Sequence, residues 1–283
     1  MRLRQWLSVP DVLRIITPPL VAFLLLGGLA KKGSNVFHTQ SAYAKNDIYL
    51  ADYIPPGDPK GCVFMFHGFP GSVKNYDIAE ELARKGYRVI APHYRGLGQS
   101  RGYGTFSFEQ SINEMEQLVR EFKADNPRCR ITFLGHSWGG LVSISLSDLA
   151  DELILMAPLS FIPTNDSDIP TSNPTEKPYS SLDKFTVFLH EMSYEFTGTS
   201  VEDLRSELKR ISQNLEHKAE QYGLSEKSMK IFHGTEDSVI PYSQSVKLSK
   251  KTKNATLKKI EGAEHLLLQN RQKFIDAISN EFR

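Results

Sequence analysis

From residue 45 onward, short apolar runs alternate along the chain with longer segments that have helical periodicity. The apolar runs are residues 47–54, 62–68, 87–94, 129–135, 152–159, 229–234 and 255–262. Most of them are almost continuously apolar, which is typical of parallel strands that are covered on both faces. Between them, segments 74–85, 107–122 and 267–282 repeat apolar residues at helical spacing. This alternation predicts an α/β domain with a mostly parallel central sheet and helices on both faces.

Residues 160–226 interrupt this alternation. Segment 160–183 contains four prolines among many Ser, Thr and Asp residues, which indicates an irregular excursion. Two helical segments follow it, the first at 184–196 and the second after Ser200, which forms a capping box with Asp203. We interpret 160–226 as an insertion into one domain rather than as a separate domain.

Residues 1–35 form a hydrophobic N-terminal segment ahead of the domain, which we assign to residues 36–283. Its unbroken apolar part, 15–30, is shorter than the roughly 20 residues of a membrane-spanning helix. Residues 42–44, AYA, have the small-x-small form of a signal-peptide cleavage site. The segment predicts a signal anchor or a signal peptide, with a buried N-terminal helix of the domain as the alternative. It favours membrane association or export over a cytoplasmic location.

Charge and cysteine content narrow the classes of partner and cofactor. The formal net charge of +1 and the lack of a basic patch with interleaved aromatic residues argue against a nucleic-acid partner. Two cysteines, Cys62 and Cys129, are too few for a disulfide framework or a structural zinc site, and buried free thiols are favoured for them. The histidines lack metal-ligand spacing, so neither a metal nor an organic cofactor is expected.

The segment FLGHSWGGL, residues 133–141, places Ser137 between Gly135 and Gly139. A strand-like run precedes this serine and an apolar helical segment follows it, which is the context of a nucleophile held on a sharp strand-to-helix turn. The glycines are required because side chains next to the serine would collide with the neighbouring chain. This context favours a nucleophilic Ser137 over an ordinary small turn residue.

Two further motifs support a family resemblance. The run 62–68 leads into HGFPG, and residues 91–100 read APHYRGLGQS. With GHSWGG, they resemble the α/β-hydrolase superfamily and its monoacylglycerol lipase and serine aminopeptidase-like branch, over roughly residues 45–283. His93 stands where that pattern has Asp. The resemblance implies an α/β-hydrolase fold with a small helical lid at 160–226, and it puts the strands that begin at Cys62 and Cys129 side by side, so a disulfide is the alternative to free thiols.

The family's chain order of nucleophile, acid and histidine assigns the other catalytic residues. Asp237, which precedes Val-Ile-Pro, is the implied acid, and Glu236 is the competitor. His265 is the one histidine of eight that follows Asp237. The backbone N–H groups of Phe69 and Trp138 are the implied oxyanion hole.

Two other histidines are given structural roles. His67 is interpreted as a hydrogen-bonding residue of the HGFPG loop, and His136 is expected to point away from Ser137 because consecutive turn residues do not share a direction.

These residues predict a serine hydrolase that cleaves a carboxylic ester through an acyl-enzyme. An apolar lid, with Phe185 and Phe188 joining Phe69 and Trp138 as substrate-binding residues, favours a lipid-like ester such as a monoacylglycerol or a lysophospholipid. A peptidase or acyl thioesterase with the same triad is the alternative, and a non-catalytic α/β-hydrolase scaffold is a third.

Overall fold

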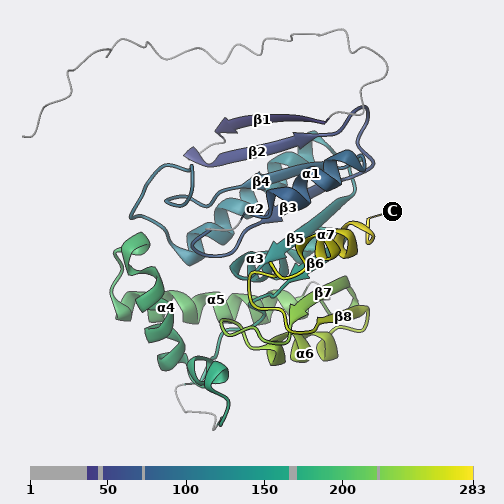
Figure 1. The fold of residues 1–283 in the computed structure, drawn as a ribbon. Helices are drawn as coiled ribbons and strands as arrows, with labels where there is room; N and C mark the ends of the chain where they lie inside the picture. Colours follow the sequence, from purple (N-terminus) through teal and green to yellow (C-terminus); the bar gives the residue numbers. More distant parts are fainter. Residues whose placement is uncertain (1–36, 44–46, 72–73, 166–170, 222–223, 283) are drawn as a thin grey trace, which may run out of the picture. The chain divides into compact units, whose positions relative to one another are not determined.

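An eight-stranded sheet organises the residues that the computed structural model describes, which are 37–43, 47–71, 74–165, 171–221 and 224–282. Its strand order is β1-β2-β4-β3-β5-β6-β7-β8 (Figure 1). The strands are β1 (His38–Tyr43), β2 (Tyr49–Ile54), β3 (Cys62–Phe66), β4 (Arg88–Pro92), β5 (Ile131–His136), β6 (Glu152–Met156), β7 (Ser228–Gly234) and β8 (Ala255–Ile260). The β1–β2 and β2–β4 pairs are antiparallel and the others are parallel, which confirms the mostly parallel sheet.

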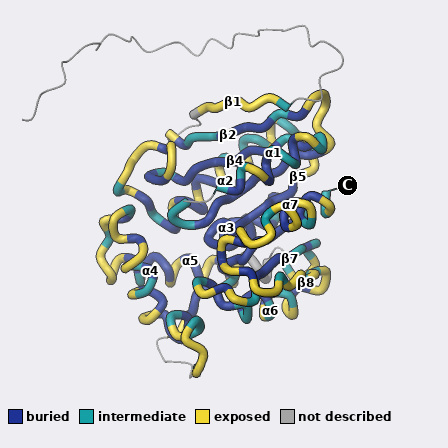
Figure 2. Tube along the Cα trace, in the orientation of Figure 1, coloured by how far each residue is buried: buried dark blue, intermediate teal, exposed yellow. Residues whose placement is uncertain are grey.

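Helices cover both faces of this sheet, as the alternation of segments predicts. Phe64 and Phe66 of β3 point to the face covered by α2 (Phe108–Asp125), α3 (Trp138–Ser145), α5 (Val201–Gln221) and α6 (Tyr242–Lys251). Val63 and Met65 point to the opposite face, which is covered by α1 (Tyr76–Arg84) and α7 (Arg271–Ser279). The central strands are buried on both sides (Figure 2), so their continuous apolar sequences follow directly from their position.

Residues 160–226, which the sequence predicts to be an insertion, lie between β6 and β7. The insertion comprises the short helices η3 (Pro174–Tyr179) and η4 (Leu224–Glu226), and the longer helices α4 (Leu182–Thr197) and α5. Leu204, Leu208 and Ile211 of α5 are buried in the core that α2 and α3 share. Glu207 of α5 accepts hydrogen bonds from the Ser107 hydroxyl (2.5 Å) and the Glu109 N–H (2.8 Å) at the start of α2. The insertion is therefore fastened to the core along α5.

A disulfide joins Cys62 to Cys129, with their Cα atoms 6.0 Å apart. The expectation of two free thiols is wrong. Strands β3 and β5 are parallel neighbours, and their register places Cys62 opposite Ile131. Since Cys129 lies just before β5, this register brings the two thiols within bonding range.

The hydrophobic segment predicted at residues 1–35 lies outside the described residues. Those that the structure describes fall within one compact unit, Asn35–Arg283. Among them, no helix combines the length and apolar character needed to cross a membrane.

Candidate active site

Ser137 lies on the sharp turn between β5 and α3, with φ at 56° and ψ at −118°. Such a conformation costs energy for a residue with a side chain, and surrounding hydrogen bonds must hold it. The Ser137 N–H donates to the Met156 carbonyl (3.0 Å), and its own carbonyl accepts from Gly140 (2.9 Å) and Leu159 (3.0 Å). The end of β6 thus fixes the turn and presents the serine hydroxyl at the carboxyl edge of the sheet.

The glycines of GHSWGG are explained by close approach of the main chain rather than by positive φ. A Cβ on Gly139 would overlap the Phe66 carbonyl of β3, and a Cβ on Gly135 would overlap the Gly139 carbonyl. The turn packs directly against β3 because these positions carry no side chain.

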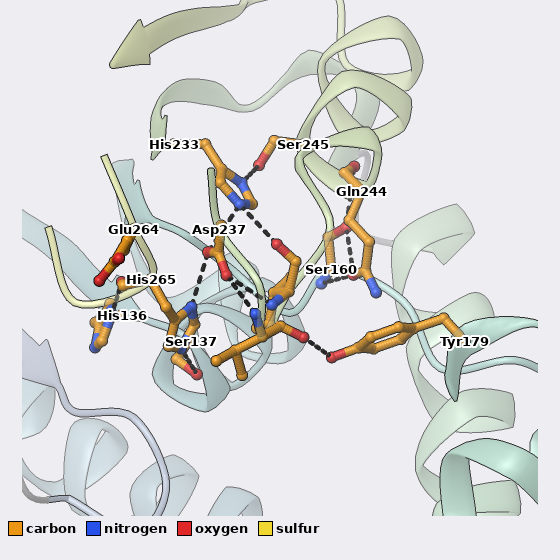
Figure 3. A network of polar contacts seen from close by, with 12 residues as sticks. His136, Ser137, Ser160, Tyr179, His233, Asp237, Gln244, Ser245, Glu264 and His265 are labelled. Carbon is orange, nitrogen blue, oxygen red and sulfur yellow. Dashed lines mark hydrogen bonds and ion pairs between the residues drawn. The ribbon is translucent and has the colours of Figure 1, made fainter. Parts of the chain in front are cut away.

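Three residues from separate parts of the chain meet at this turn (Figure 3). The Ser137 hydroxyl lies 3.0 Å from Nε2 of His265, and Nδ1 of His265 lies 2.8 Å from Oδ2 of Asp237. Asp237 follows β7, and His265 lies between β8 and α7. All three side chains are buried, with 7%, 4% and 8% exposure for Ser137, Asp237 and His265. The structure therefore brings together the three residues that the chain order selected.

The carboxylate of Asp237 accepts hydrogen bonds on both oxygens. Oδ1 accepts from the N–H groups of Val239 (2.9 Å) and Ile240 (2.8 Å), and Oδ2 accepts from His265 and from His233 (3.1 Å). Burial alone would raise the pKa of Asp237, but the hydrogen bonds from both histidines outweigh it and hold the pKa below its usual range. Asp237 is therefore ionised, and its hydrogen bonds hold the carboxylate in one orientation. The competing acid, Glu236, is exposed.

Two histidines beside the triad have supporting contacts that the sequence did not reveal. His233 bonds directly to Asp237. His136 turns away from the Ser137 hydroxyl, as expected, but its Nε2–H donates to the His265 carbonyl at 3.0 Å. Burial, followed by the nearby His265, lowers the pKa of His136 to about 3, so the ring is neutral. The sequence signals that could have indicated these contacts are the position of His233 on the strand before the acid and that of His136 directly before the serine.

The HGFPG loop lies against the nucleophile, since a Cβ on Gly68 would be 2.9 Å from the Cβ of Ser137. Within the loop, His67 Nδ1–H donates to the Gly68 carbonyl at 2.7 Å. Burial, together with the nearby Lys74, lowers the pKa of His67 well below its usual value. Among the described residues, no protein group accepts a hydrogen bond from the main-chain N–H of Phe69 or Trp138.

His93, where the family pattern has Asp, bridges two elements on the other side of this loop. Its Nε2 lies 2.5 Å from the Tyr76 hydroxyl, and its Nδ1 accepts from the Gln99 N–H at 2.9 Å. The substitution therefore changes local hydrogen bonding without touching Ser137.

The four side chains expected to bind substrate differ in how far they are buried. The Trp138 indole is 2% exposed and donates to the Ser111 hydroxyl at 3.1 Å, and Phe185 is 1% exposed beside Tyr179. Both pack in the core, because α3 and α4 turn these faces inward, so their expected pocket role is not supported. Phe69 and Phe188 are half-buried.

A cavity of about 630 Å³ lies between the insertion and α6. Ser160, Phe161, Tyr179, Leu215, Lys247 and Leu248 are among the residues that line it, and Ser137, Asp237 and His265 are not. In the described part of the chain, no cluster of three or more His, Cys, Asp or Glu side chains could hold a metal ion.

An eight-stranded, mostly parallel sheet with a serine on the turn after its β5 strand defines the α/β-hydrolase fold. Solved structures agree with this assignment. A monoacylglycerol lipase from Paleococcus ferrophilus matches with a TM-score of 0.59 at 19% identity, covering 82% of this chain and 97% of that one. Est1E from Butyrivibrio proteoclasticus, solved with ferulic acid, matches with a TM-score of 0.59 at 20% identity, covering 85% and 96%.

Sequence relatives point to the same superfamily. Residues 57–177 match the serine aminopeptidase S33 family model. Monoglyceride lipase of Rattus norvegicus is 34% identical over 100 residues, and epoxide hydrolase 3 of Xenopus tropicalis is 26% identical over 164 residues. These matches cover 34% and 52% of this chain, but only 33% and 43% of the relatives' own lengths. The chain has the α/β-hydrolase fold and is similar in sequence to members of the monoacylglycerol lipase and serine aminopeptidase-like branch of that superfamily.

The family match contains Ser137 and the HGFPG loop but ends before Asp237 and His265. The acid and the histidine are therefore assigned by the geometry around Ser137.

Proposed function

We propose that the protein is a serine hydrolase that cleaves carboxylic esters by way of an acyl-enzyme. The observation that carries this proposal is the unbroken hydrogen-bonded chain from Ser137 through His265 to Asp237, with links of 3.0 Å and 2.8 Å. A non-catalytic scaffold has no need for this alignment, which argues against that alternative.

The geometry supports a two-step acyl transfer. Nδ1 of His265 faces only the carboxylate, so it carries the proton, and Nε2 is free to accept the proton of the Ser137 hydroxyl. As the serine oxygen attacks the ester carbonyl, His265 takes that proton and then gives it to the departing alkoxide. Water, deprotonated by the same nitrogen, attacks the acyl-enzyme and releases the acid and the free serine. Asp237 keeps the ring oriented and offsets its positive charge.

The N–H groups of Phe69 and Trp138 are the proposed oxyanion hole. Both belong to segments that flank Ser137, and neither donates to a protein acceptor among the described residues. Preorganised donors of this kind contribute roughly 3–4 kcal/mol each to an acyl-transfer transition state.

A lipid-like ester, such as a monoacylglycerol or a lysophospholipid, is the proposed substrate. The Phe69 ring packs against Phe106, Phe108 and Phe196, with ring centroids 5.1 to 5.5 Å apart, so the wall beside the proposed oxyanion hole is apolar. A relative and a solved structure of similar fold are both named as lipases of monoacylglycerols. Peptidase and thioesterase activities would use the same triad and are the alternatives.

A fluorophosphonate probe tests the nucleophile, because it forms a covalent bond only with an activated serine. We expect labelling of the wild type and none of Ser137→Ala. Asp237→Asn and His265→Ala should each lower kcat by about 10³-fold or more. Glu236→Gln is the matched control, and a comparable loss in that variant would contradict the assignment of the acid.

Graded p-nitrophenyl esters, run beside aminoacyl amides and acyl thioesters, test the substrate class. A folded wild type that is neither labelled nor active on any of them would refute the proposal.

We further infer that the domain works in an oxidising compartment or at a membrane facing one. The Cys62–Cys129 disulfide supports this, because such bonds persist mainly outside the cytosol, and the apolar segment within residues 1–35 would direct export or anchoring. Extracted from cells and denatured so that the buried Cys62 is accessible, the full chain should resist thiol alkylation unless it is first reduced, whereas a chain without residues 1–35 should be alkylated at both cysteines. Free alkylation of the full chain would contradict the inference.

A further inference from the structure

His233 is the one histidine besides His265 that bonds to Asp237 within the described part of the chain. It lies near the end of β7, four residues before the acid, and its side chain is completely buried (Figure 3). We propose that His233, held by Ser245, is a positioning residue that keeps the Asp237 carboxylate turned toward His265. The proposal rests on the proposed function, since the triad is what His233 would position.

The contacts of His233 determine which nitrogen carries the proton. Nε2 lies 3.1 Å from Oδ2 of Asp237 and 3.0 Å from the Ile240 carbonyl oxygen, and both of these atoms accept. Nε2 must therefore be protonated and donates to both. Nδ1 lies 2.6 Å from the Ser245 hydroxyl of α6, which donates to it in this tautomer. The two acceptors at Nε2 thus set the tautomer in which His233 is a donor, and Ser245 satisfies and holds the other ring nitrogen.

This donor restrains the carboxylate in the direction that matters for the triad. The main-chain N–H groups of Val239 and Ile240 hold Oδ1, but they leave the carboxylate free to tilt about that oxygen. His233 and His265 hold Oδ2 from two sides. Without His233, Oδ2 would keep only its hydrogen bond to His265, and nothing would fix the plane of the Asp237 carboxylate relative to the His265 ring. A small displacement of a catalytic group can cost about 10²-fold in rate.

Ile240 connects the same restraint to the loop. Its N–H bonds Oδ1 of Asp237, while its carbonyl accepts from His233. The imidazole therefore bonds to both ends of the segment from Asp237 to Ile240. Ile240 itself is buried, with 3% exposure. The acid and its loop are thereby bonded, through His233, to both β7 and α6.

Two substitutions of similar size separate positioning from packing. In His233→Gln, the side-chain amide nitrogen occupies roughly the place of Nε2, so a donor to Asp237 is kept. In His233→Asn, the amide occupies roughly the place of Nδ1, so the contact with Ser245 is kept and the donor to Asp237 is lost. We expect His233→Asn to lower kcat on a p-nitrophenyl ester by about 10- to 100-fold with little change in KM, and His233→Gln to stay within about fivefold of the wild type.

A second measurement needs no turnover. The Nδ1–H proton of His265 is expected as a low-field signal in proton NMR, because it is buried and bonded to a carboxylate. It should stay in place in His233→Gln and be displaced or lost in His233→Asn. If the wild type hydrolyses no substrate, the proposed function fails, and this comparison still decides the positioning role.

Ser245→Ala tests the partner of His233 without altering the imidazole. It should lower kcat, while Ser193→Ala, which removes an equally buried hydroxyl that has no partner among the described residues, should not. This pair also decides the matter if His233→Asn does not fold. Two results would overturn the proposal. The first is that His233→Gln and His233→Asn have equal kcat values and an unmoved His265 proton signal. The second is that Ser245→Ala and Ser193→Ala have equal kcat values.

Discussion

At position 139, the main chain of the nucleophile turn passes so close to β3 that no side chain fits. A Cβ there would overlap the Phe66 carbonyl and crowd the His67 carbonyl, and these backbone atoms cannot move away by changing a rotamer. Gly139→Ala should therefore destabilise the protein by more than about 3 kcal/mol and abolish ester hydrolysis. The loss of stability is measured by denaturant unfolding that is monitored by circular dichroism.

Gly57→Ala is the control for this change. Gly57 has φ at +87°, but no atom lies within 4 Å of the place of its Cβ. The replacement should cost only the backbone strain of about 1–2 kcal/mol and leave hydrolysis intact. If Gly139→Ala were as stable and active as Gly57→Ala, the close packing of the turn against β3 could not be what requires glycine.

At the scale of elements, the apolar runs located all seven of the predicted strands. Buried parallel strands such as β3 and β5 must be apolar on both faces, so their sequences carry the signal. The same holds for the order of the triad residues, because Asp237 and His265 each follow a strand whose carboxyl end meets the edge where Ser137 lies. Local pattern was sufficient for the strands, whereas the choice of Asp237 and His265 also needed the family resemblance.

Features that depend on contacts between segments were predicted less well from the sequence, and the disulfide was only the alternative to free thiols. Strand β1, HTQSAY, is an exposed edge strand paired only with β2, so it has no apolar pattern to reveal it. The Cys62–Cys129 disulfide depends on the register between β3 and β5. The indole of Trp138, which was expected to bind substrate, is buried and donates to the Ser111 hydroxyl. For the disulfide, the deciding partner lies 67 residues away along the chain.

Among the residues that the structure describes, His67, His93 and His136 lie buried outside the triad with pKa values below the usual range. Burial, together with the nearby Lys74, lowers the pKa of His67 well below its usual value and that of His93 to about 4, and burial lowers that of His136 to about 3. In the unfolded chain such rings bind protons below about pH 6.5. Between about pH 6.5 and pH 4, the unfolded state therefore holds more protons than the native state, and native stability is complete above this range and falls as the pH is lowered through it.

Each of these rings can remove about 1.4 kcal/mol of stability per pH unit within that range. We expect the urea midpoint to be constant between pH 8 and pH 7 and to fall steadily from pH 6.5 to pH 4.5. His93→Gln should reduce the slope by about one proton per molecule, because Gln does not titrate. His38→Gln is the control for the substitution itself, at an exposed histidine. A midpoint that stays level down to pH 4.5 would mean that these rings gain their protons in the native state, which would contradict their burial as neutral groups around the active site.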